Sequence, residues 1–348
     1  GVNHAKFRLK IKDFLRTYFA PYYRINLMGC LIYFTCGRYE FRNKGIDVYI
    51  KALAELNRRL KNRPEAYDVY AFIWVPTAVK GPKEEIMANM VTFRRILEII
   101  DEELEKVRFN LIDVVTSGEI ESADISEILT DKFIADCRTI VSQFKREGNP
   151  PLCAFNLLYD ENNDIIVKTL REVGLTNKPD DRVRVIFYPA YLNPSDQLLG
   201  LSYYEALNGS DLGVFPSTYE PWGYTPAETA ALTTLSVTTD LSGFGQFLLE
   251  NTDQTKKPGL RVILREGKTD EEAIAQLADI MEEVALMNKD TLVEKKLSAR
   301  EIAELSDWRL QIFHYIRAHN LACERVYGNS ENASDGEVEE KTELSNQA

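Results

Sequence analysis

Apolar and polar positions along the chain alternate in a way that predicts a parallel sheet with helices between its strands. Runs rich in β-branched and aromatic residues, at 31–35 and 69–75, are typical of buried strands. Residues 47–60, between them, have the apolar spacing of an amphipathic helix. Strand, helix and strand in this order form a βαβ unit, which implies parallel pairing. After residue 150 the same pattern predicts strands at 152–155, 183–188, 212–215, 236–239 and 259–264 and helices at 164–173, 203–208, 225–233, 271–287 and 298–327.

Residues 80–147 interrupt this alternation with two amphipathic segments, 84–115 and 124–145, each of which predicts one helix. A helical pair of this length is either an insertion that covers one edge of the domain or a contact between subunits. The predicted fold class is therefore α/β, a Rossmann-like parallel sheet with a long helical insertion. The predicted segments are the start of the sheet domain (1–79), the insertion (80–147), the rest of that domain with a C-terminal helix (148–328) and an acidic tail too poor in apolar residues to fold (329–348).

Composition narrows the class of protein. A length of 348 residues suggests about two structural units. The 42 Lys and Arg residues against 54 Asp and Glu give a net charge of −12, which disfavours a general nucleic-acid binder. Five scattered cysteines and three histidines indicate reduced thiols, a cytoplasmic protein and no zinc site. No apolar run is long enough to predict a membrane span. We interpret the basic residues of 1–24 as a solvated helix face.

The densest cluster of candidate functional residues lies at 216–228, between a predicted strand and a helix. Open α/β sheets bind ligands at this carboxyl edge. Gly223 allows the backbone to approach a ligand, and the free N–H groups near Tyr224 and Thr225 can bind a phosphate, aided by the helix dipole. The simpler alternative is a helix start with a carboxylate near its positive end.

Two glutamates of this segment, Glu220 and Glu228, can reach the same cleft, where paired acids bind sugar hydroxyls or stabilise an oxocarbenium-like transition state. A second strand-end loop carries Arg38 and Lys44, which either hold a diphosphate leaving group or are ordinary solvated cations. A third, at 240–245, contains Gly243, where the backbone can approach a ligand closely; alone this is a weak signal.

These loops together are typical of a sugar-nucleotide site, and their sequences resemble those of the eukaryotic-type glycogen synthases. The resemblance rests on Arg38-Tyr-Glu-Phe with Asn43-Lys-Gly, on Tyr219-Glu-Pro-Trp-Gly-Tyr-Thr-Pro-Ala-Glu228 and on Leu241-Ser-Gly-Phe-Gly245. It runs from Gly1 to about Tyr327. Many retaining glycosyltransferases share the two glutamates at this spacing, whereas the ten-residue string is far narrower.

The resemblance implies the C-terminal, donor-binding half of a two-domain GT-B enzyme without its N-terminal domain. That family transfers glucose from UDP-glucose to the non-reducing end of an α-1,4-glucan, glycogen, with retention and with no metal or other cofactor. The implied partners are the missing N-terminal domain, glycogenin and three further copies of the chain in a homotetramer formed through residues 84–145. The resemblance implies neither a nucleic acid nor a membrane as a partner. Two alternatives stay open: a catalytically impaired nucleotide-binding or oligomerising module, and a transferase for another nucleotide sugar.

The resemblance also implies roles for individual residues. Arg38 and Lys44 hold the UDP phosphates, Glu220 lies beside the transferred glucose, and Glu228 lies by the ribose or the sugar. Whether retention uses front-face attack or a covalent intermediate stays open, as does the division of labour between the glutamates. The further binding residues implied are Tyr203 stacking on uracil, Tyr191 nearby, and Gly223, Tyr224, Thr225 and Gly243 at the phosphates or the donor.

The chain departs from the family pattern at three places. Tyr188-Pro-Ala-Tyr191 replaces His-Pro-Glu-Phe, and Ala154-Phe155-Asn156 replaces Thr-His-Asn. Where regulated members carry an arginine-rich helix that senses glucose 6-phosphate, this chain has only Lys295, Lys296 and Arg300. A phosphate site needs clustered cations, so we do not expect that regulation.

Overall fold

The computed structural model describes residues 2–118 and 124–328. The chain divides into two compact units, residues 1–304 and residues 305–348. The first unit holds both sheets, and the described part of the second consists mainly of α12 (Trp308–Tyr327). The predicted acidic tail, 329–348, lies outside the described residues, so its disorder stays a prediction.

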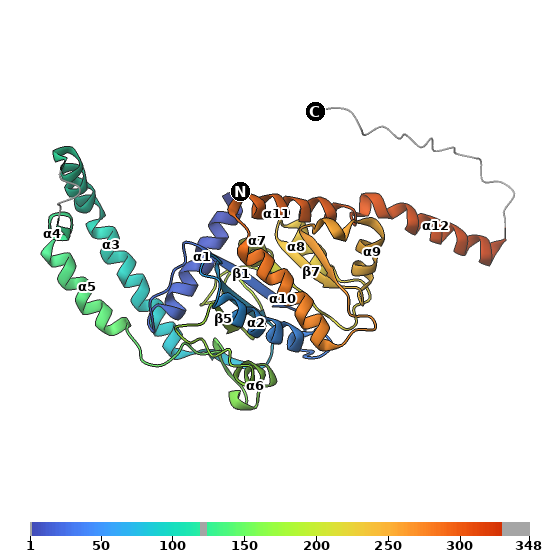
Figure 1. Ribbon diagram of the computed structural model, residues 1–348, viewed down its shortest axis with the longest axis horizontal. Coiled ribbons are helices and arrows are strands. Elements are labelled where there is room, and N and C mark those ends of the chain that lie inside the picture. The colour runs from blue at the N-terminus through green and yellow to red at the C-terminus, as the bar shows by residue number, and fades with distance from the viewer. Residues whose placement is uncertain (1, 119–123, 329–348) are drawn as a thin grey trace. The chain divides into compact units, whose positions relative to one another are not determined.

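Six parallel strands form the main sheet of the first unit, in the order β5-β2-β1-β6-β7-β8. Figure 1 labels β5, β1 and β7 of this sheet. The order reverses between β1 and β6, which is the doubly wound arrangement of Rossmann-like folds. This confirms the predicted α/β fold class. The carboxyl ends of β1 and β6 flank a crevice at this reversal, where such sheets bind ligands. The strands are β1 (Cys30–Cys36), β2 (Asp68–Trp74), β5 (Val183–Phe187), β6 (Leu212–Val214), β7 (Leu235–Thr239) and β8 (Leu260–Ile263).

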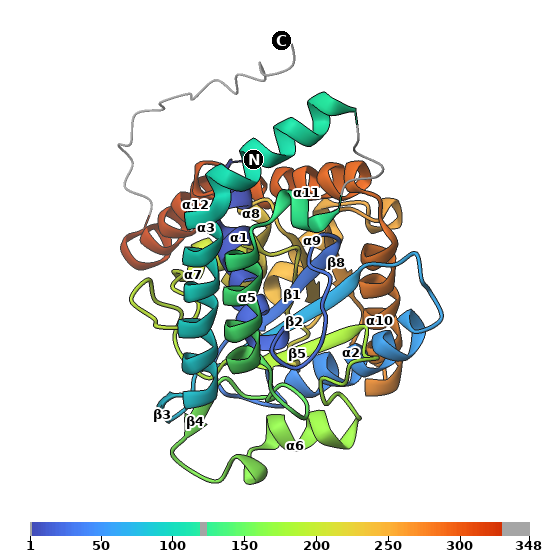
Figure 2. The same cartoon turned by 90° about the vertical axis from the view of Figure 1, so that its left-hand side faces the viewer.

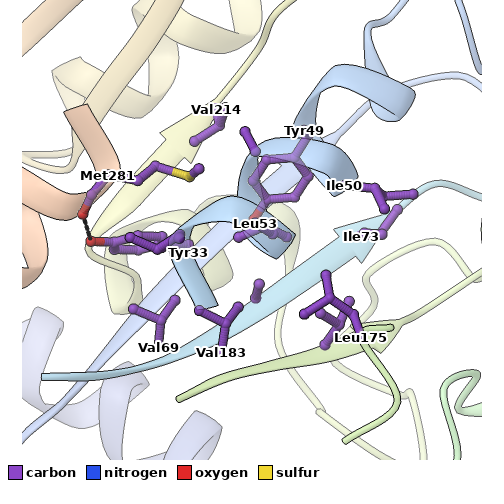
Figure 3. Packing of buried hydrophobic residues seen from close by; sticks show 14 of the residues in the cluster. Tyr33, Tyr49, Ile50, Leu53, Val69, Ile73, Leu175, Val183, Val214 and Met281 are labelled. Atoms are coloured by element: carbon purple, nitrogen blue, oxygen red, sulfur yellow. Dashed lines mark hydrogen bonds between the residues drawn. The ribbon is translucent and has the colours of Figure 1, made fainter. Parts of the chain in front are cut away.

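Helices cover both faces of the sheet because successive side chains of a strand point to opposite faces. In β1, Leu31 and Tyr33 belong to one buried cluster, and Ile32 and Phe34 to another. In the first cluster the Tyr33 hydroxyl donates to the Met281 carbonyl at 2.9 Å (Figure 3). The first cluster takes apolar residues from α2 (Ile46–Leu60), α6 (Ile165–Glu172) and α10 (Asp270–Leu286), and the second from α1 (Val2–Phe19) and α7 (Tyr203–Gly209).

A third, smaller cluster of buried residues lies beside the edge of the sheet that carries β7 and β8. It joins three helices to β8, with Ala230, Phe244 and Ala299 at its centre. These helices are α8 (Tyr224–Ala231), α9 (Gly243–Asn251) and α11 (Lys289–Glu304). The start of α8 lies directly after the crevice loop of β6, so this packing holds the loop that carries most candidate site residues.

The predicted insertion forms a helical arm between β2 and β5. Its long helix, α3 (Glu84–Ser117), contains the predicted 84–115, and α5 (Asp131–Phe144) lies beside it (Figure 2). The second helix, predicted to be continuous over 124–145, is wrong in this respect, because the structure divides it into α4 (Ile125–Ile128) and α5. The first helix ends at Ile128, and Thr130 begins the second, since its hydroxyl accepts a hydrogen bond from the Phe133 N–H at 3.2 Å.

Two further predicted elements differ from the structure. The strand expected at 152–155 makes only an isolated parallel bridge to β5, between Cys153 and Phe187. The strand of this region is β4 (Phe155–Leu157), which pairs antiparallel with β3 (Val79–Pro82) outside the main sheet. The helix expected at 298–327 is two helices, α11 and α12, because the Asp307 carboxylate accepts from the Arg309 N–H at 2.8 Å and starts a new helix. Two short 3₁₀ turns, Glu161–Asn163 and Gln254–Lys256, complete the described elements.

The basic residues near the start of the chain are only partly a solvated face. Arg8, in α1, forms an ion pair at 2.5 Å with Asp211, whose side chain is buried just before β6. The predicted solvated face is therefore wrong at Arg8, because helix packing turns this residue inward, while Lys6 and Lys10 are exposed. Among the helices that the structure describes, none is long and apolar enough to cross a membrane.

Candidate active site

Two adjoining cavities lie in the crevice at the carboxyl ends of β1 and β6. The larger has a volume of about 410 Å³ and the smaller about 210 Å³. Both are lined by Cys36, Gly37, Arg38 and Thr225, so they form the two ends of one binding region. The other residues of the larger cavity are Tyr39, Trp74, Pro76, Ala190, Tyr191, Leu192 and Tyr203, and those of the smaller are Lys44, Phe215, Ser217, Glu220, Gly223, Tyr224, Pro226, Thr238 and Ser242.

The loop after β1 and the loop after β6 are fastened to each other. Gly45 has a φ of 65°, and a Cβ atom there would lie 1.9 Å from the Pro216 carbonyl oxygen, so a side chain has no room. The Thr218 N–H donates to the Asn43 carbonyl at 2.9 Å across the same contact. This contact fixes Lys44 of one loop opposite the acidic residue of the other.

The loop after β6 is also held by residues that follow β7 and β8 or end them. The Thr239 hydroxyl donates to the Ser217 carbonyl at 2.9 Å, and the buried Arg265 guanidinium donates to the Pro216 carbonyl at 2.5 Å. These bonds satisfy carbonyls that a buried loop would otherwise leave unpaired. The loop is therefore a fixed wall of the cavity.

The predicted cations and the first glutamate lie together in the crevice. The Lys44 ammonium donates to the Glu220 carboxylate, and both side chains are partly buried. Arg38 lies at the junction of the two cavities, with its side chain 78% exposed and its guanidinium 2.9 Å from the Glu40 carboxylate. The smaller cavity thus has a lysine and a glutamate facing each other across it, and the exposed Arg38 lies at its junction with the larger cavity.

The amino end of α8 opens into the smaller cavity. Gly223 is the residue before the helix, with a φ of 109°, and it has no side chain to cap the first N–H groups. Tyr224 and Thr225 form the first turn and line the cavity. Free N–H groups and the helix dipole favour an anion at this point. The structure therefore brings the predicted phosphate-binding residues beside Lys44.

Glu228, one turn further along α8, lines neither cavity, but it bonds to a tyrosine that lines the larger one. The Tyr203 hydroxyl donates to its carboxylate at 2.9 Å. Burial, with Cys36 and Glu228 acting in the same direction, raises the pKa of Tyr203 far above its usual value, so the phenol stays protonated and donates. Burial also raises the pKa of the Cys36 thiol to about 12, which keeps it neutral. Tyr191, at the mouth of the same cavity, is 82% exposed.

Gly243, like Glu228, lines neither cavity. A Cβ atom at this position would lie 2.2 Å from the Pro221 carbonyl oxygen, and the Gly243 N–H donates to the Glu220 carbonyl at 3.1 Å. The glycine permits a close approach of backbone to backbone and so fixes the loop that carries Glu220. Its predicted contact with a ligand stays a prediction.

Several residues that line the cavities, or that contact Glu228 beside them, were missed in the sequence. Cys36 and Trp74 are the last residues of β1 and β2, a position that marks the ligand edge in any parallel sheet. They could therefore have been found by counting to the strand ends. Ser242, in the smaller cavity, carried no such signal, and neither did Tyr204, whose bond to Glu228 depends on how α7 and α8 meet.

Within residues 2–118 and 124–328, no cluster of three or more His, Cys, Asp or Glu side chains has a geometry that could hold a metal ion. Reaction without a metal stays a prediction from the resemblance.

Comparison with known proteins assigns the chain to a family. Residues 2–347 match the family described as Glycogen synthase. The chain is 35% identical over 336 residues to the Saccharomyces cerevisiae glycogen [starch] synthase isoform 2, covering 93% of this chain and 47% of that protein. It is 33% identical to the Caenorhabditis elegans glycogen [starch] synthase and 31% to the human liver protein, with 93% of this chain covered in both and 48% and 46% of those proteins.

Solved structures that match part of the chain include an α,α-trehalose 6-phosphate synthase from Burkholderia multivorans, at 14% identity and a TM-score of 0.38, covering 88% of this chain and 46% of that one. WaaG, a glycosyltransferase involved in lipopolysaccharide biosynthesis, is 13% identical with the same TM-score, covering 94% of this chain and 51% of that one. The chain spans about half the length of the curated relatives it matches. On the family match and these relatives, this chain belongs to the glycogen synthase family.

Proposed function

We propose that this chain is the donor-binding half of a GT-B enzyme that transfers glucose from UDP-glucose to the non-reducing end of glycogen, an α-1,4-glucan, with retention. The observation that carries the proposal is the convergence of Arg38, Lys44 and the amino end of α8 with Glu220 in one crevice. Cations and free N–H groups are the partners that a diphosphate takes. An acid beside them lies where a transferring sugar has to bind.

In this proposal the chain acts mainly by stabilising charge. As the bond between glucose and UDP breaks, negative charge grows on the diphosphate, where Lys44, Arg38 and the N–H groups of Tyr224 and Thr225 receive it. Glu220 lies on the sugar side and stabilises positive charge on the glucose ring. No metal or other cofactor takes part, because these cations supply the charge that a divalent ion supplies elsewhere.

The larger cavity is the proposed nucleoside site. Tyr203 and Trp74 line it with aromatic side chains, and Tyr191 stands at its mouth. Aromatic side chains are suited to stacking on a planar base. The uracil then lies at the end of the crevice away from Glu220, with the ribose near Glu228.

The half of the relatives' length that this chain does not span is the proposed N-terminal domain, which closes over the donor and supplies the glucan site. We also propose a homotetramer through 84–145. Along α3, Leu97, Leu104 and Leu111 recur every seven residues and are 42%, 56% and 46% exposed, a spacing suited to a helix–helix contact. Alternatively, the helical arm 84–145 covers one edge of a monomer. Contact with glycogenin and a cytoplasmic location are proposed on the resemblance alone.

Calorimetric titration of UDP into the chain tests the donor site. We expect binding that Arg38→Ala weakens at least several-fold, because a cation at the junction of both cavities is lost. Arg42→Ala is the matched control, since Arg42 is equally exposed and pairs with Asp47 away from the cavities. Equal effects of the two substitutions contradict the assignment.

ADP and GDP, titrated in parallel, test the alternative of a different nucleotide sugar. We expect both to bind more weakly than UDP, and tighter binding of either favours that alternative. UDP binding without transfer, after the N-terminal half is supplied, favours the impaired nucleotide-binding module.

A further inference from the structure

Glu228 is held by two adjacent tyrosines, one on each carboxylate oxygen. The Tyr203 hydroxyl donates to Oε2 at 2.9 Å, and the Tyr204 hydroxyl donates to Oε1 at 3.2 Å. The two rings meet edge to face, with centroids 5.0 Å apart and planes at 63°. A single rotation of the carboxylate would break both bonds, so the pair fixes its plane.

The two tyrosines are themselves fixed by the start of α7. The Ser202 N–H donates to the Glu205 carboxylate at 2.9 Å in a capping box, which sets the direction of the first helical turn. Tyr203 and Tyr204 are the first two residues of that turn. Their positions therefore follow from the cap and do not need a ligand.

Glu228 has no cation to orient it. Among the described residues it forms no ion pair, whereas Glu220 is oriented by Lys44. A carboxylate has about four acceptor positions, of which the two phenols occupy two. The remaining positions are free to accept hydroxyl groups from a ligand, and a fixed plane suits two neighbouring hydroxyls.

The two phenols differ in their access to a ligand. Tyr203 lines the larger cavity, so its substitution changes the cavity itself. Tyr204 and Glu228 line neither cavity, and Tyr204 is 54% exposed. Tyr204 can therefore affect a ligand only through Glu228, whose Oε2 lies 2.9 Å from the Tyr203 hydroxyl in the wall of the larger cavity.

We propose that Tyr204 is a positioning residue that, together with Tyr203, orients the Glu228 carboxylate to accept the two ribose hydroxyls of the bound nucleotide. This inference rests on the proposed function, because it assumes a nucleotide with its base beside Tyr203. It extends that function by assigning a role in selecting ribonucleotides over deoxyribonucleotides to a side chain outside the binding cavity.

The hydrogen bond is tested without a ligand. The charge of Glu228, and then its hydrogen bond, raise the pKa of Tyr204. In a chain labelled with ¹³C at the tyrosine ring carbon that bears the hydroxyl, Glu228→Gln is expected to lower the ionisation midpoint of Tyr204, whose signal is identified by Tyr204→Phe. Tyr219, 65% exposed on the loop after β6, is the control signal and should not move. An unchanged ionisation midpoint of Tyr204 would show that its hydroxyl does not bond to Glu228, and this would overturn the proposal.

The positioning role is tested by calorimetry with UDP and with 2′,3′-dideoxy-UDP. Tyr204→Phe is expected to weaken UDP binding roughly two- to tenfold, the range for one hydrogen bond, and to leave dideoxy-UDP binding unchanged. Tyr219→Phe should change neither. Equal weakening for both ligands, or none for UDP, overturns the role, because a general structural defect does not depend on the ribose hydroxyls.

The two proposals fail in different ways. If the unsubstituted chain does not bind UDP, the proposed donor site is contradicted. The tyrosine titration still decides whether Tyr204 bonds to Glu228. If UDP binds and Tyr204→Phe has no effect, the donor site stands and the positioning role is wrong.

Discussion

Lys44 and Glu220 neutralise each other in the crevice, and this pairing has a consequence for ligand binding. Lys44 is 17% exposed and Glu220 28%, so the contact is only partly screened by water. A diphosphate that takes Lys44 has to compete with the carboxylate and also meets its negative charge. The cost of this competition is part of the affinity that the chain shows for UDP.

Glu220→Gln is therefore expected to tighten UDP binding roughly two- to tenfold, because it removes both the competing partner and the repulsion. Calorimetry measures the change, and Glu55→Gln, which alters a surface carboxylate far from the crevice, serves as the control. Weaker binding of UDP by Glu220→Gln speaks against Lys44 as the phosphate ligand.

Asp211 is a second residue whose charge depends on its neighbours. Its buried carboxylate accepts from Lys296 at 2.8 Å, from the Ile32 N–H at 2.8 Å and from Arg8. Burial raises its pKa, but Lys296 and Arg8 outweigh burial and hold the pKa of Asp211 well below its usual value. Because the folded-state pKa is the lower one, the carboxylate stabilises the fold above the ordinary pKa of about 3.9 and loses this effect as the pH falls below it.

Asp211→Asn is expected to cost about 3–5 kcal/mol of unfolding free energy at neutral pH, since it leaves two cations buried without a counter-charge. Urea unfolding at several pH values measures this cost, and the loss of stability below about pH 4 should be smaller in the variant. If Asp211→Asn does not fold, Lys296→Met, which removes one cation and keeps the apolar stem, provides the comparison. Neutral-pH stability equal to that of the unsubstituted chain would contradict the role of Asp211.

At the scale of elements, the end of α8 carries a residue in an unfavourable conformation. Thr233 has a φ of 63°, where a β-branched side chain is strained. Its N–H donates to the Ala230 carbonyl at 2.9 Å, and the Thr234 N–H donates to the Thr229 carbonyl at 3.3 Å. This is the Schellman arrangement, in which glycine is the usual residue at the left-handed position.

Thr233→Gly is therefore expected to raise the unfolding free energy by about 1 kcal/mol, because relief of the strained conformation exceeds the added freedom of the unfolded chain. Thermal unfolding measures the shift. Thr234→Gly is the matched control and should destabilise, since Thr234 is buried and its hydroxyl donates to the Leu207 carbonyl at 2.9 Å. A lower melting temperature for Thr233→Gly would show that the threonine makes a compensating contact.

Helices and strands with a regular spacing of apolar residues could be predicted from the sequence, but the breaks within them could not. The buried runs of β1 and β2 and the apolar stripe of α3 follow directly from their periods. The break between α11 and α12 depends on one cap, Asp307, inside a continuous helical pattern. At the site, strand ends located the crevice and its three loops, but the pairing of Tyr204 with Glu228 depends on the packing of α7 against α8.

At the scale of the whole molecule, the chain is proposed to be only part of an active site. The crevice carries charges for the donor, and nothing in the first unit has been assigned to the glucan. In a GT-B enzyme the second domain closes over the donor and excludes water from it. Binding of UDP and transfer of glucose should therefore be separable properties.

Adding the N-terminal half of the Saccharomyces cerevisiae relative as a separate chain is expected to produce glucose transfer to glycogen that neither chain shows alone. Incorporation of labelled glucose from UDP-glucose measures it, and a mixture containing Glu220→Gln is the inactive control. Robust turnover by the isolated chain would contradict the proposal that its site is incomplete.

The helical arm inserted between β2 and β5 has a consequence for how the protein folds. These two strands are neighbours in the sheet, with Val69 opposite Val183, yet residues 75–182 separate them along the chain. Closing a loop of this length costs only roughly 1 kcal/mol more than closing an ordinary crossover of about 30 residues. The insertion therefore lowers the unfolding free energy only slightly. Its effect is kinetic, because contacts between distant residues form slowly. The edge strand β5 should therefore join only after β1 and β2 have formed a hydrophobic nucleus on which it can dock.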